Sequence, residues 1–223
     1  MRSEFLCALC CFVLWSCTQN QDNFITANIV DPAALKGISK FRSCCGHDYS
    51  AGGESNRSMK HYLYPKANYP ISNTALPVYA PFDGEVIAIT REEHQIPCFN
   101  DLQGYQVKIL PYARSDMSMR IFHVNPTVGK GPVNAGQQIG YADLRSCDGQ
   151  GGTATLASFD VAIEGGGTRH SMFPLLNDDT FGAWAARGIS SREATIISRE
   201  ARDAQQCSDY QNTACNADTI NLP

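Results

Sequence analysis

Histidine and carboxylate side chains supply most of the chemistry that this sequence could perform. His47 and Asp48 are adjacent, His61 follows them, and His123 and Asp160 lie further along the chain. Imidazole and carboxylate groups can bind a metal ion or exchange protons with a substrate. These five residues are therefore the candidates for a metal site or an acid–base site.

The segment from residue 41 to residue 64 concentrates polar functional groups, which is typical of a chain that lines a cleft. Besides two of the histidines it contains arginine, lysine and tyrosine side chains. We predict that a binding cleft is lined by Arg42, His47, Asp48, Tyr49, Lys60, His61, Tyr64 and His123. The alternative is structural: His47 and Asp48 cap a turn, His61 packs in the core, and Asp160 is solvated.

The elements that would position these residues are short strands. Between residues 41 and 164, β-rich runs are separated by Gly, Pro and Asn, which is typical of an antiparallel sheet. The turn Asp83-Gly84 between two such runs predicts a hairpin. The expected strands cover residues 85–89, 104–110, 117–123 and 153–164, and residues 133–141 are expected to form a turn followed by a strand.

The character of the sequence changes after the consecutive glycines at 165–167. Residues 176–187 predict a helix that is capped by Asn177 or Asp178. Residues 192–204 predict a second helix, and the remainder from residue 209 is expected to be an irregular tail. The chain therefore predicts a β domain with a helical appendage.

The N-terminus has the features of a secretory signal. Arg2 precedes an apolar run at 5–15, which is too short to span a bilayer but matches the core of a signal peptide. Ser16-Cys17 resembles the cleavage box of bacterial lipoproteins, in which the cysteine is lipidated. We predict a signal peptide at 1–16, a lipid on Cys17, a tether at 17–35, and a location at the membrane of the bacterial envelope. The alternative is a plain secretory signal.

Length and charge narrow the possibilities. The 223 residues, of which 43% are hydrophobic and 18% charged, are enough for one domain with a buried core. With 18 basic and 22 acidic residues the net charge is −4, which argues against an electrostatic binder of nucleic acid.

The ten cysteines fall into two groups. Four lie in the first seventeen residues, and six follow at Cys44, Cys45, Cys98, Cys147, Cys207 and Cys215. An envelope location permits disulfides, and six thiols allow fifteen pairings. Two pairings are attractive because the partners lie in one tail or in neighbouring loops, namely Cys207–Cys215 and Cys98–Cys147.

Four motifs occur in a definite order: VYAPFDGEV at 78–86, GYQV at 104–107, FH at 122–123 and VNAGQQIG at 133–140. Their order resembles that of the lysostaphin/LytM-type zinc endopeptidases, which cut peptidoglycan cross-bridges. The resemblance covers about residues 41–164. It implies a mainly β fold with an antiparallel core of the barrel-sandwich-hybrid type. We place this LytM-like domain at 36–167, and a two-helix extension and tail at 168–223.

The resemblance also implies a zinc site, from which this sequence departs. Members of the family bind one Zn²⁺ through a His, an Asp four residues later and the second His of a His-x-His strand. The first matching position carries His61, but the residues after it are Tyr64 at three residues and Pro65 at four, so no Asp follows, and Leu156 and Ser158 replace the two histidines of that strand. Only His123 keeps the position of a histidine that assists catalysis in the family. A catalytic zinc needs three protein ligands, so this pattern is short of ligands.

We therefore expect a non-catalytic domain with no cofactor. It would bind peptidoglycan or regulate a cell-wall enzyme through the former substrate groove, with no nucleic-acid partner. The alternative is a divergent metallo-endopeptidase that cleaves peptidoglycan peptides with zinc in a rebuilt site. The ligands of that rebuilt site would come from His47, Asp48, His61 and Asp160.

Overall fold

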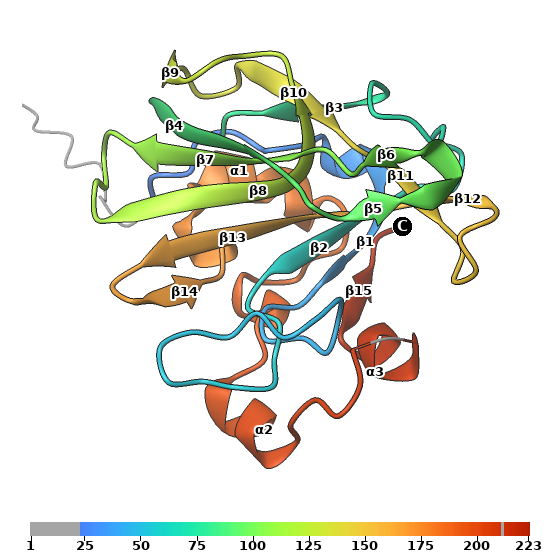
Figure 1. The fold of residues 1–223 in the computed structure, drawn as a ribbon. Coiled ribbons are helices and arrows are strands. Elements are labelled where there is room, and N and C mark those ends of the chain that lie inside the picture. Colours follow the sequence, from blue (N-terminus) through green and yellow to red (C-terminus); the bar gives the residue numbers. More distant parts are fainter. Residues whose placement is uncertain (1–22, 211) are drawn as a thin grey trace, which may run out of the picture.

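One large antiparallel sheet organises the part of the chain that the computed structural model describes, residues 23–210 and 212–223 (Figure 1). The expected mainly β fold class is confirmed. The expected signal peptide and the lipidation site at Cys17 lie outside the described residues. No helix within these residues is long and apolar enough to cross a membrane.

The strands are short and follow one another with few helices between them. They are β1 (Leu35–Ser39), β2 (His61–Pro65), β3 (Leu76–Tyr79), β4 (Gly84–Arg91), β5 (Gln95–Ile96), β6 (Asp101–Leu102), β7 (Tyr105–Pro111), β8 (Met117–Pro126), β9 (Gly131–Val133), β10 (Gln138–Ala142), β11 (Arg145–Cys147), β12 (Ala154–Leu156), β13 (Phe159–Gly165), β14 (Thr168–His170) and β15 (Thr219–Asn221). The α-helices are α1 (Asp178–Ala185), α2 (Arg199–Ala204) and α3 (Asn212–Ala217). Single 3-10 turns lie at Pro32–Ala34, Pro97–Phe99, Phe173–Leu175 and Glu193–Thr195.

The order of strands in the main sheet differs from their order in the chain. It runs β15-β1-β2-β13-β8-β7-β4-β9, with β10 joining β3 to β8 and β14 extending β13. Strands from both ends of the described chain therefore lie beside strands from its middle.

The sheet has an apolar face and a polar face because side chains alternate along each strand. On β13, Val161 and Ile163 belong to the hydrophobic core, and Asp160 and Glu164 alternate with them. We call the side that carries Asp160 and Glu164 the polar face.

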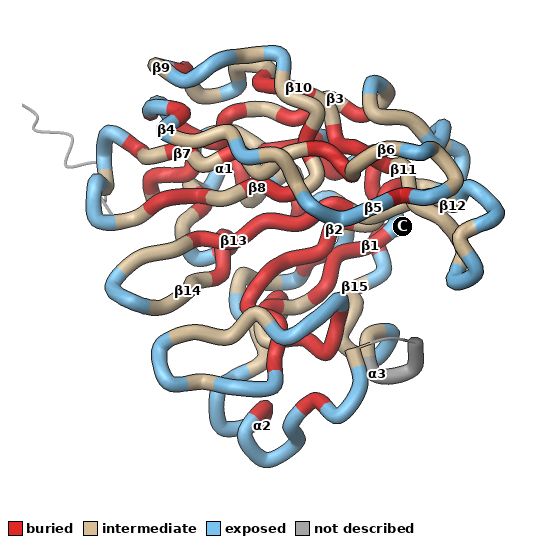
Figure 2. Tube along the Cα trace, in the orientation of Figure 1, coloured by how far each residue is buried: buried red, intermediate tan, exposed pale blue. Residues whose placement is uncertain are grey.

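The apolar face is covered by segments that flank the strands in sequence. Phe24 packs against Phe82 with ring centres 5.4 Å apart, and Trp184 of α1 packs edge-on against Phe173 at 5.3 Å. Trp184 is fully buried and donates a hydrogen bond to Asn28 Oδ1 at 2.6 Å. Figure 2 shows the buried strands as a continuous centre with exposed loops around it.

The first expected helix is confirmed as α1. Asn177 is its N-cap, and the Asn177 side chain accepts a backbone hydrogen bond at 2.8 Å. The second expected helix is wrong over most of its length, because only Arg199–Ala204 is α-helical. Ile196 instead forms a β-bridge with Phe41, an extended conformation that β-branched residues favour.

Two strand predictions are also wrong. The Asp83-Gly84 turn does not close a hairpin, because β3 pairs with β10 whereas β4 pairs with β7 and β9. Glycine is needed at position 84 because a Cβ there would collide with the carbonyl oxygen of Leu110 in β7. The expected strand at 153–164 is two strands, β12 and β13, separated by Ala157-Ser158.

Residues 168–223, expected to be a helical extension and tail, contribute two strands to the main sheet. β14 pairs with β13, and β15 pairs with β1. The expected irregular tail is therefore wrong at Thr219–Asn221, which supplies hydrogen-bond partners to the edge of β1.

Disulfides fasten the C-terminal segment to the loop that follows β1. Two disulfides make this connection, Cys44–Cys207 and Cys45–Cys215. A third disulfide among the described residues, Cys98–Cys147, joins the 3-10 turn at Pro97–Phe99 to β11. The expected Cys98–Cys147 bond is confirmed. The other pairing that the sequence made attractive, Cys207–Cys215, does not form, because the adjacent pair Cys44-Cys45 bonds to both of these cysteines.

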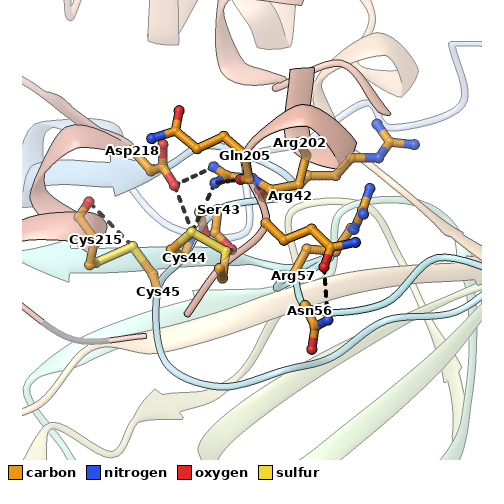
Figure 3. The surroundings of a disulfide bond; sticks show 12 residues. Arg42, Ser43, Cys44, Cys45, Asn56, Arg57, Arg202, Gln205, Cys215 and Asp218 are labelled. Carbon is orange, nitrogen blue, oxygen red and sulfur yellow. Dashed lines mark hydrogen bonds and ion pairs between the residues drawn. A yellow bond between two sulfur atoms is a disulfide. The ribbon is translucent and has the colours of Figure 1, made fainter. Parts of the chain in front are cut away.

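Arg202 of α2 reinforces this connection beside the Cys44–Cys207 bond (Figure 3). Its buried guanidinium donates to the carbonyl oxygen of Arg42 at 2.8 Å and to Cys44 Sγ at 2.9 Å. Arg202 also pairs at 2.5 Å with Asp218, whose carboxylate accepts from the Cys44 amide at 2.7 Å. The loop and the C-terminal segment therefore form one packed unit.

Candidate functional site

The polar face brings several of the predicted site residues together where β2, β13 and β8 lie side by side. One carboxylate oxygen of Asp160 lies 2.7 Å from Lys60 Nζ, and the other lies 3.2 Å from His123 Nε2. The Asp160 side chain is 1% exposed and that of Lys60 is 3% exposed. An ammonium group and an imidazole thus share one buried carboxylate, and we call these three residues the Lys60 cluster.

A β-bulge in β8 brings His123 to the polar face. Ile121 and Val124 are both fully buried core residues, although a regular strand would place residues three apart on opposite faces. Phe122 and His123 lie between them, and the pairing with β7 shifts register here. His123 has a φ of 56°, a left-handed conformation that costs about 1–2 kcal/mol for a residue other than glycine. Bulges and strained backbone of this kind often position functional side chains.

Lys60 is enclosed by aromatic rings and polar groups. Its ammonium lies 4.2 Å from the ring centre of Tyr49 and 3.7 Å from that of Phe122. It also contacts His47 Nε2 at 3.3 Å, and His47 Nδ1 lies 2.8 Å from the carbonyl oxygen of Asp48. Because an ammonium can only donate, Nε2 of His47 is the acceptor and Nδ1–H donates to Asp48.

The charges in the Lys60 cluster support one another. Burial alone would raise the pKa of Asp160, but the charges of Lys60 and His123 lower it to about 2. Burial alone would lower the pKa of His123, but the contact with Asp160 and the charge of Glu92 outweigh it, so this pKa lies above its usual value. The imidazole is therefore held closer to its charged form than a free histidine.

The exposed side of the cluster lies at His123 and Glu92. The His123 side chain is 22% exposed, and its Nδ1 lies 3.9 Å from Glu92 Oε1. Neither atom has a hydrogen-bond partner among residues 23–210 and 212–223. Glu92 is held by Gln106, which donates to its other oxygen at 3.1 Å. Both atoms are themselves buried, so a ligand hydroxyl could accept from His123 and donate to Glu92 only after one of these side chains moves outward.

The polar face continues from Gln106 as a chain of paired charges. Gln106 Oε1 accepts from Arg120 at 2.7 Å, and Arg120 and Lys108 pair with Glu164 at 3.1 Å and 2.9 Å. The Tyr49 hydroxyl donates to the same carboxylate at 3.1 Å. Burial alone would raise the pKa of Glu164, but Arg120 and Lys108 lower it to about 2.

His61 lies on the other face of the sheet, away from the Lys60 cluster. Its ring nitrogens lie 2.8 Å from the Ser39 carbonyl oxygen and 2.8 Å from the Ser171 hydroxyl. The ring packs edge-on against Phe173 at 5.1 Å, and burial lowers the pKa of His61 to about 4. These contacts are those of a neutral histidine that packs in the core.

Other predicted cleft residues make contacts within loops or with the C-terminal segment. Arg42 pairs with Glu54 at 2.7 Å, and the Asp48 carboxylate accepts from the backbone amide of Ser50 at 3.1 Å. The Tyr64 hydroxyl lies 3.3 Å from Cys215 Sγ. The structure thus places Lys60, His123 and Asp160 together, with His47 and Tyr49 beside them.

Glu92 and Phe122 are site residues that the sequence analysis missed. Glu92 follows β4. In the sheet β4 lies next to β7, and β7 lies next to β8, so this strand order brings Glu92 near His123 of β8. Phe122 precedes His123 in the FH motif, and this adjacency is the sequence feature from which its place at the site could have been predicted.

The zinc site that the sequence resemblance implies does not fit the residues present. Both nitrogens of His61 are engaged, and Tyr64 makes its contact with a sulfur atom. The rebuilt set does not fit either, because the Asp160 carboxylate is already paired with the Lys60 ammonium. Within the described ranges, no three His, Cys, Asp or Glu residues are grouped as metal ligands.

The structure of this chain is similar to several solved structures of peptidases. Lysostaphin is 15% identical with a TM-score of 0.36, over 69% of this chain and 56% of that chain. A zinc-containing peptidase from Vibrio cholerae is 20% identical with a TM-score of 0.42, over 67% of this chain and 38% of that chain. Pseudoalterin, a deep-sea metalloprotease, is 19% identical with a TM-score of 0.38, over 66% and 75%. No protein-family model and no curated protein matches the sequence. The chain thus spans about half of lysostaphin and just over a third of the Vibrio peptidase.

Proposed function

We propose that this chain is a non-catalytic domain of the bacterial envelope that binds peptidoglycan through the Lys60 cluster. The observation that supports this most directly is the ion pair between Lys60 and Asp160 at 2.7 Å. The ammonium compensates the buried carboxylate, and its positive charge opposes the binding of a metal cation at the same place.

The side of the cluster nearest to solvent, at His123 and Glu92, has the donors and acceptors to recognise hydroxyl-rich ligands. Nδ1 of His123 and Oε1 of Glu92 lie 3.9 Å apart, buried and without a hydrogen-bond partner among the described residues, so an outward movement of either side chain would present both to a sugar hydroxyl. The surrounding polar face, with its paired Arg120 and Glu164, offers further donors and acceptors.

Sedimentation with insoluble peptidoglycan tests the proposal. We expect the protein to sediment, and His123→Ala to weaken binding about tenfold because it removes a hydrogen bond to a charged group. His94→Ala is the matched control, since His94 is exposed and lies outside the cluster, and it should bind as the parent protein does. Failure to sediment, or equal binding by the His123 variant, would contradict wall binding and would favour a protein partner.

Metal content and peptidoglycan digestion test the competing metallo-endopeptidase. The proposal expects less than stoichiometric zinc in the purified protein, and no digestion whether or not a chelator is present. Stoichiometric zinc together with chelator-sensitive cleavage would overturn the non-catalytic function.

Membrane anchoring through Cys17 is the remaining part of the proposal. It is supported by the apolar run and the Ser16-Cys17 box of the sequence. We expect the protein to fractionate with membranes, and Cys17→Ala to prevent lipid attachment as measured by mass spectrometry. An unmodified, soluble parent protein would indicate plain secretion instead.

A further inference from the structure

A pocket opens on the polar face at the β15 edge of the sheet, where β2, β1 and β15 lie side by side. Tyr62 pairs with Asp160, so Tyr64, two residues further along β2, lies on the same face. Gly37 of β1 pairs with Tyr64 on one side and with Asn221 of β15 on the other. The three residues form a row across the sheet with no side chain in the middle.

The pocket has a volume of about 430 Å³, which is within the usual range for sites that bind small molecules. α3 closes one side of it through Cys215 and Asn216. The other lining residues come from the sheet and include Lys36, Tyr64, Thr219 and Asn221.

Glycine at position 37 keeps the floor of this pocket open. The φ of Gly37 lies outside the left-handed region, so the backbone does not require glycine here. A Cβ would lie 3.3 Å from Thr219 Cγ2 and 3.1 Å from the Ile220 carbonyl oxygen, closer than side chains usually approach. A larger residue would therefore press against the wall that Thr219 forms.

The lining offers hydrogen-bond donors around one unpaired cation. Lys36 is exposed and makes no ion pair with any described residue. The side-chain amides of Asn216 and Asn221 each carry two donor hydrogens. Burial raises the pKa of Tyr64 to about 12, so its hydroxyl stays protonated and can donate. Its present contacts are a hydrogen bond with Thr219 and Cys215 Sγ at 3.3 Å, and sulfur is only a weak acceptor.

We propose that this pocket binds a small carboxylate. A carboxylate has two acceptor oxygens and a negative charge, which match the Lys36 ammonium and the neighbouring amides. The size of the pocket fits a dipeptide or a single sugar ring, so the carboxylate could be the terminus of a short peptide or a sugar acid. This site is separate from the Lys60 cluster and does not depend on the proposed function.

Isothermal titration calorimetry on the full mature chain tests the site. The probes are N-acetyl-D-alanyl-D-alanine for a peptide terminus and N-acetylmuramic acid for a sugar acid, each compared with its carboxamide. We expect saturable binding of at least one acid, and its carboxamide to bind at least about tenfold more weakly. The acid that binds identifies the source. The proposal is wrong if neither acid binds or if the carboxamides bind as tightly.

Variants locate the binding within the pocket. Lys36→Gln should weaken binding of the acid at least about tenfold, whereas Lys130→Gln, which changes an exposed lysine elsewhere, should leave it unchanged. Gly37→Ala should also weaken binding, with buried Trp184 fluorescence reporting that the variant is folded. Equal binding by the Lys36 variant would overturn the proposal.

His123→Ala distinguishes this proposal from the proposed function. The variant should bind the small acid as the parent does, because His123 does not line the pocket. Loss of acid binding in this variant would place the acid at the Lys60 cluster and overturn the second site. If the parent protein binds the small acid but does not sediment with peptidoglycan, only the proposed function is contradicted.

Discussion

Replacing Lys60 with methionine tests how the buried charges of the polar face are balanced. Methionine has a similar length and suits the contacts with the Tyr49 and Phe122 rings, but it leaves the Asp160 carboxylate without its partner at 2.7 Å. Breaking a buried ion pair from one side costs about 3–5 kcal/mol. His123 remains 3.2 Å from Asp160, and its pKa is raised, so it can supply part of the missing charge.

The expected loss therefore depends on pH. We expect Lys60→Met to lower the free energy of unfolding by about 3 kcal/mol at pH 8, where the His123 imidazole is less charged than at lower pH. At pH 5.5 the charged imidazole compensates the carboxylate more fully, and the loss should be smaller than at pH 8. Urea denaturation followed by fluorescence measures both values, because Trp184 is fully buried.

Two further variants complete the test. The double variant Lys60→Met/Asp160→Leu removes both charges, and it should be more stable than Lys60→Met alone. Lys108→Met is the control for a partly exposed pair, since Lys108 is 28% exposed and Glu164 keeps Arg120, and it should cost about 1 kcal/mol or less. A loss below about 1 kcal/mol for Lys60→Met at pH 8, or a double variant that is less stable than this single one, would refute the reasoning.

Three other outcomes follow from the fold. As the pH falls from 6.5 towards 4, stability should fall by up to about 3 kcal/mol, because unfolded His61 takes up a proton that the folded state, with its pKa lowered to about 4, excludes. Urea denaturation of His61→Gln across this range should show a shallower slope. His123→Ala should change the slope above pH 6.5 instead, removing a loss of stability that the parent shows there, because the raised pKa of His123 stabilises the folded state below its ordinary pKa and this contribution is lost as the pH rises through the folded value. Trypsin without reductant should release residues 43–57 and 203–223 as one disulfide-linked species in mass spectrometry, and unlinked peptides would contradict the pairing. Gly46→Ala should cost about 2 kcal/mol or more in thermal or urea unfolding, since φ there is 71° and a Cβ would collide with the Tyr62 hydroxyl, and a neutral effect would contradict the packing of this loop.

The strands could be predicted because their sequence pattern is local. Alternation at 104–110 and 117–123 predicts β7 and β8, and the Asn177 cap predicts the start of α1. The hairpin predicted at Asp83-Gly84 is wrong because the local sequence does not show which strands pair. Strand pairing depends on contacts between distant segments.

The candidate site was only partly visible in the sequence for the same reason. Lys60 and His61 are adjacent and equally polar, yet they end on different faces of the sheet, and only the strand register distinguishes them. The bulge that brings His123 to the polar face is an insertion of one residue relative to β7, which no local pattern marks. Glu92 reaches the site through the order of strands in the sheet.

The pairing of β1 with β15 has a consequence for the order in which the protein folds. β2 can pair with one edge of β1 early. The other edge pairs with Thr219–Asn221, so its backbone N–H and C=O groups stay unpaired while the intervening chain is made. Contacts between such distant segments form slowly, and an open strand edge can pair with other chains. The bonds from Cys44 and Cys45 to the C-terminal segment close this edge covalently. The reduced chain is therefore the form most exposed to aggregation, and oxidation is the step that ends this exposure.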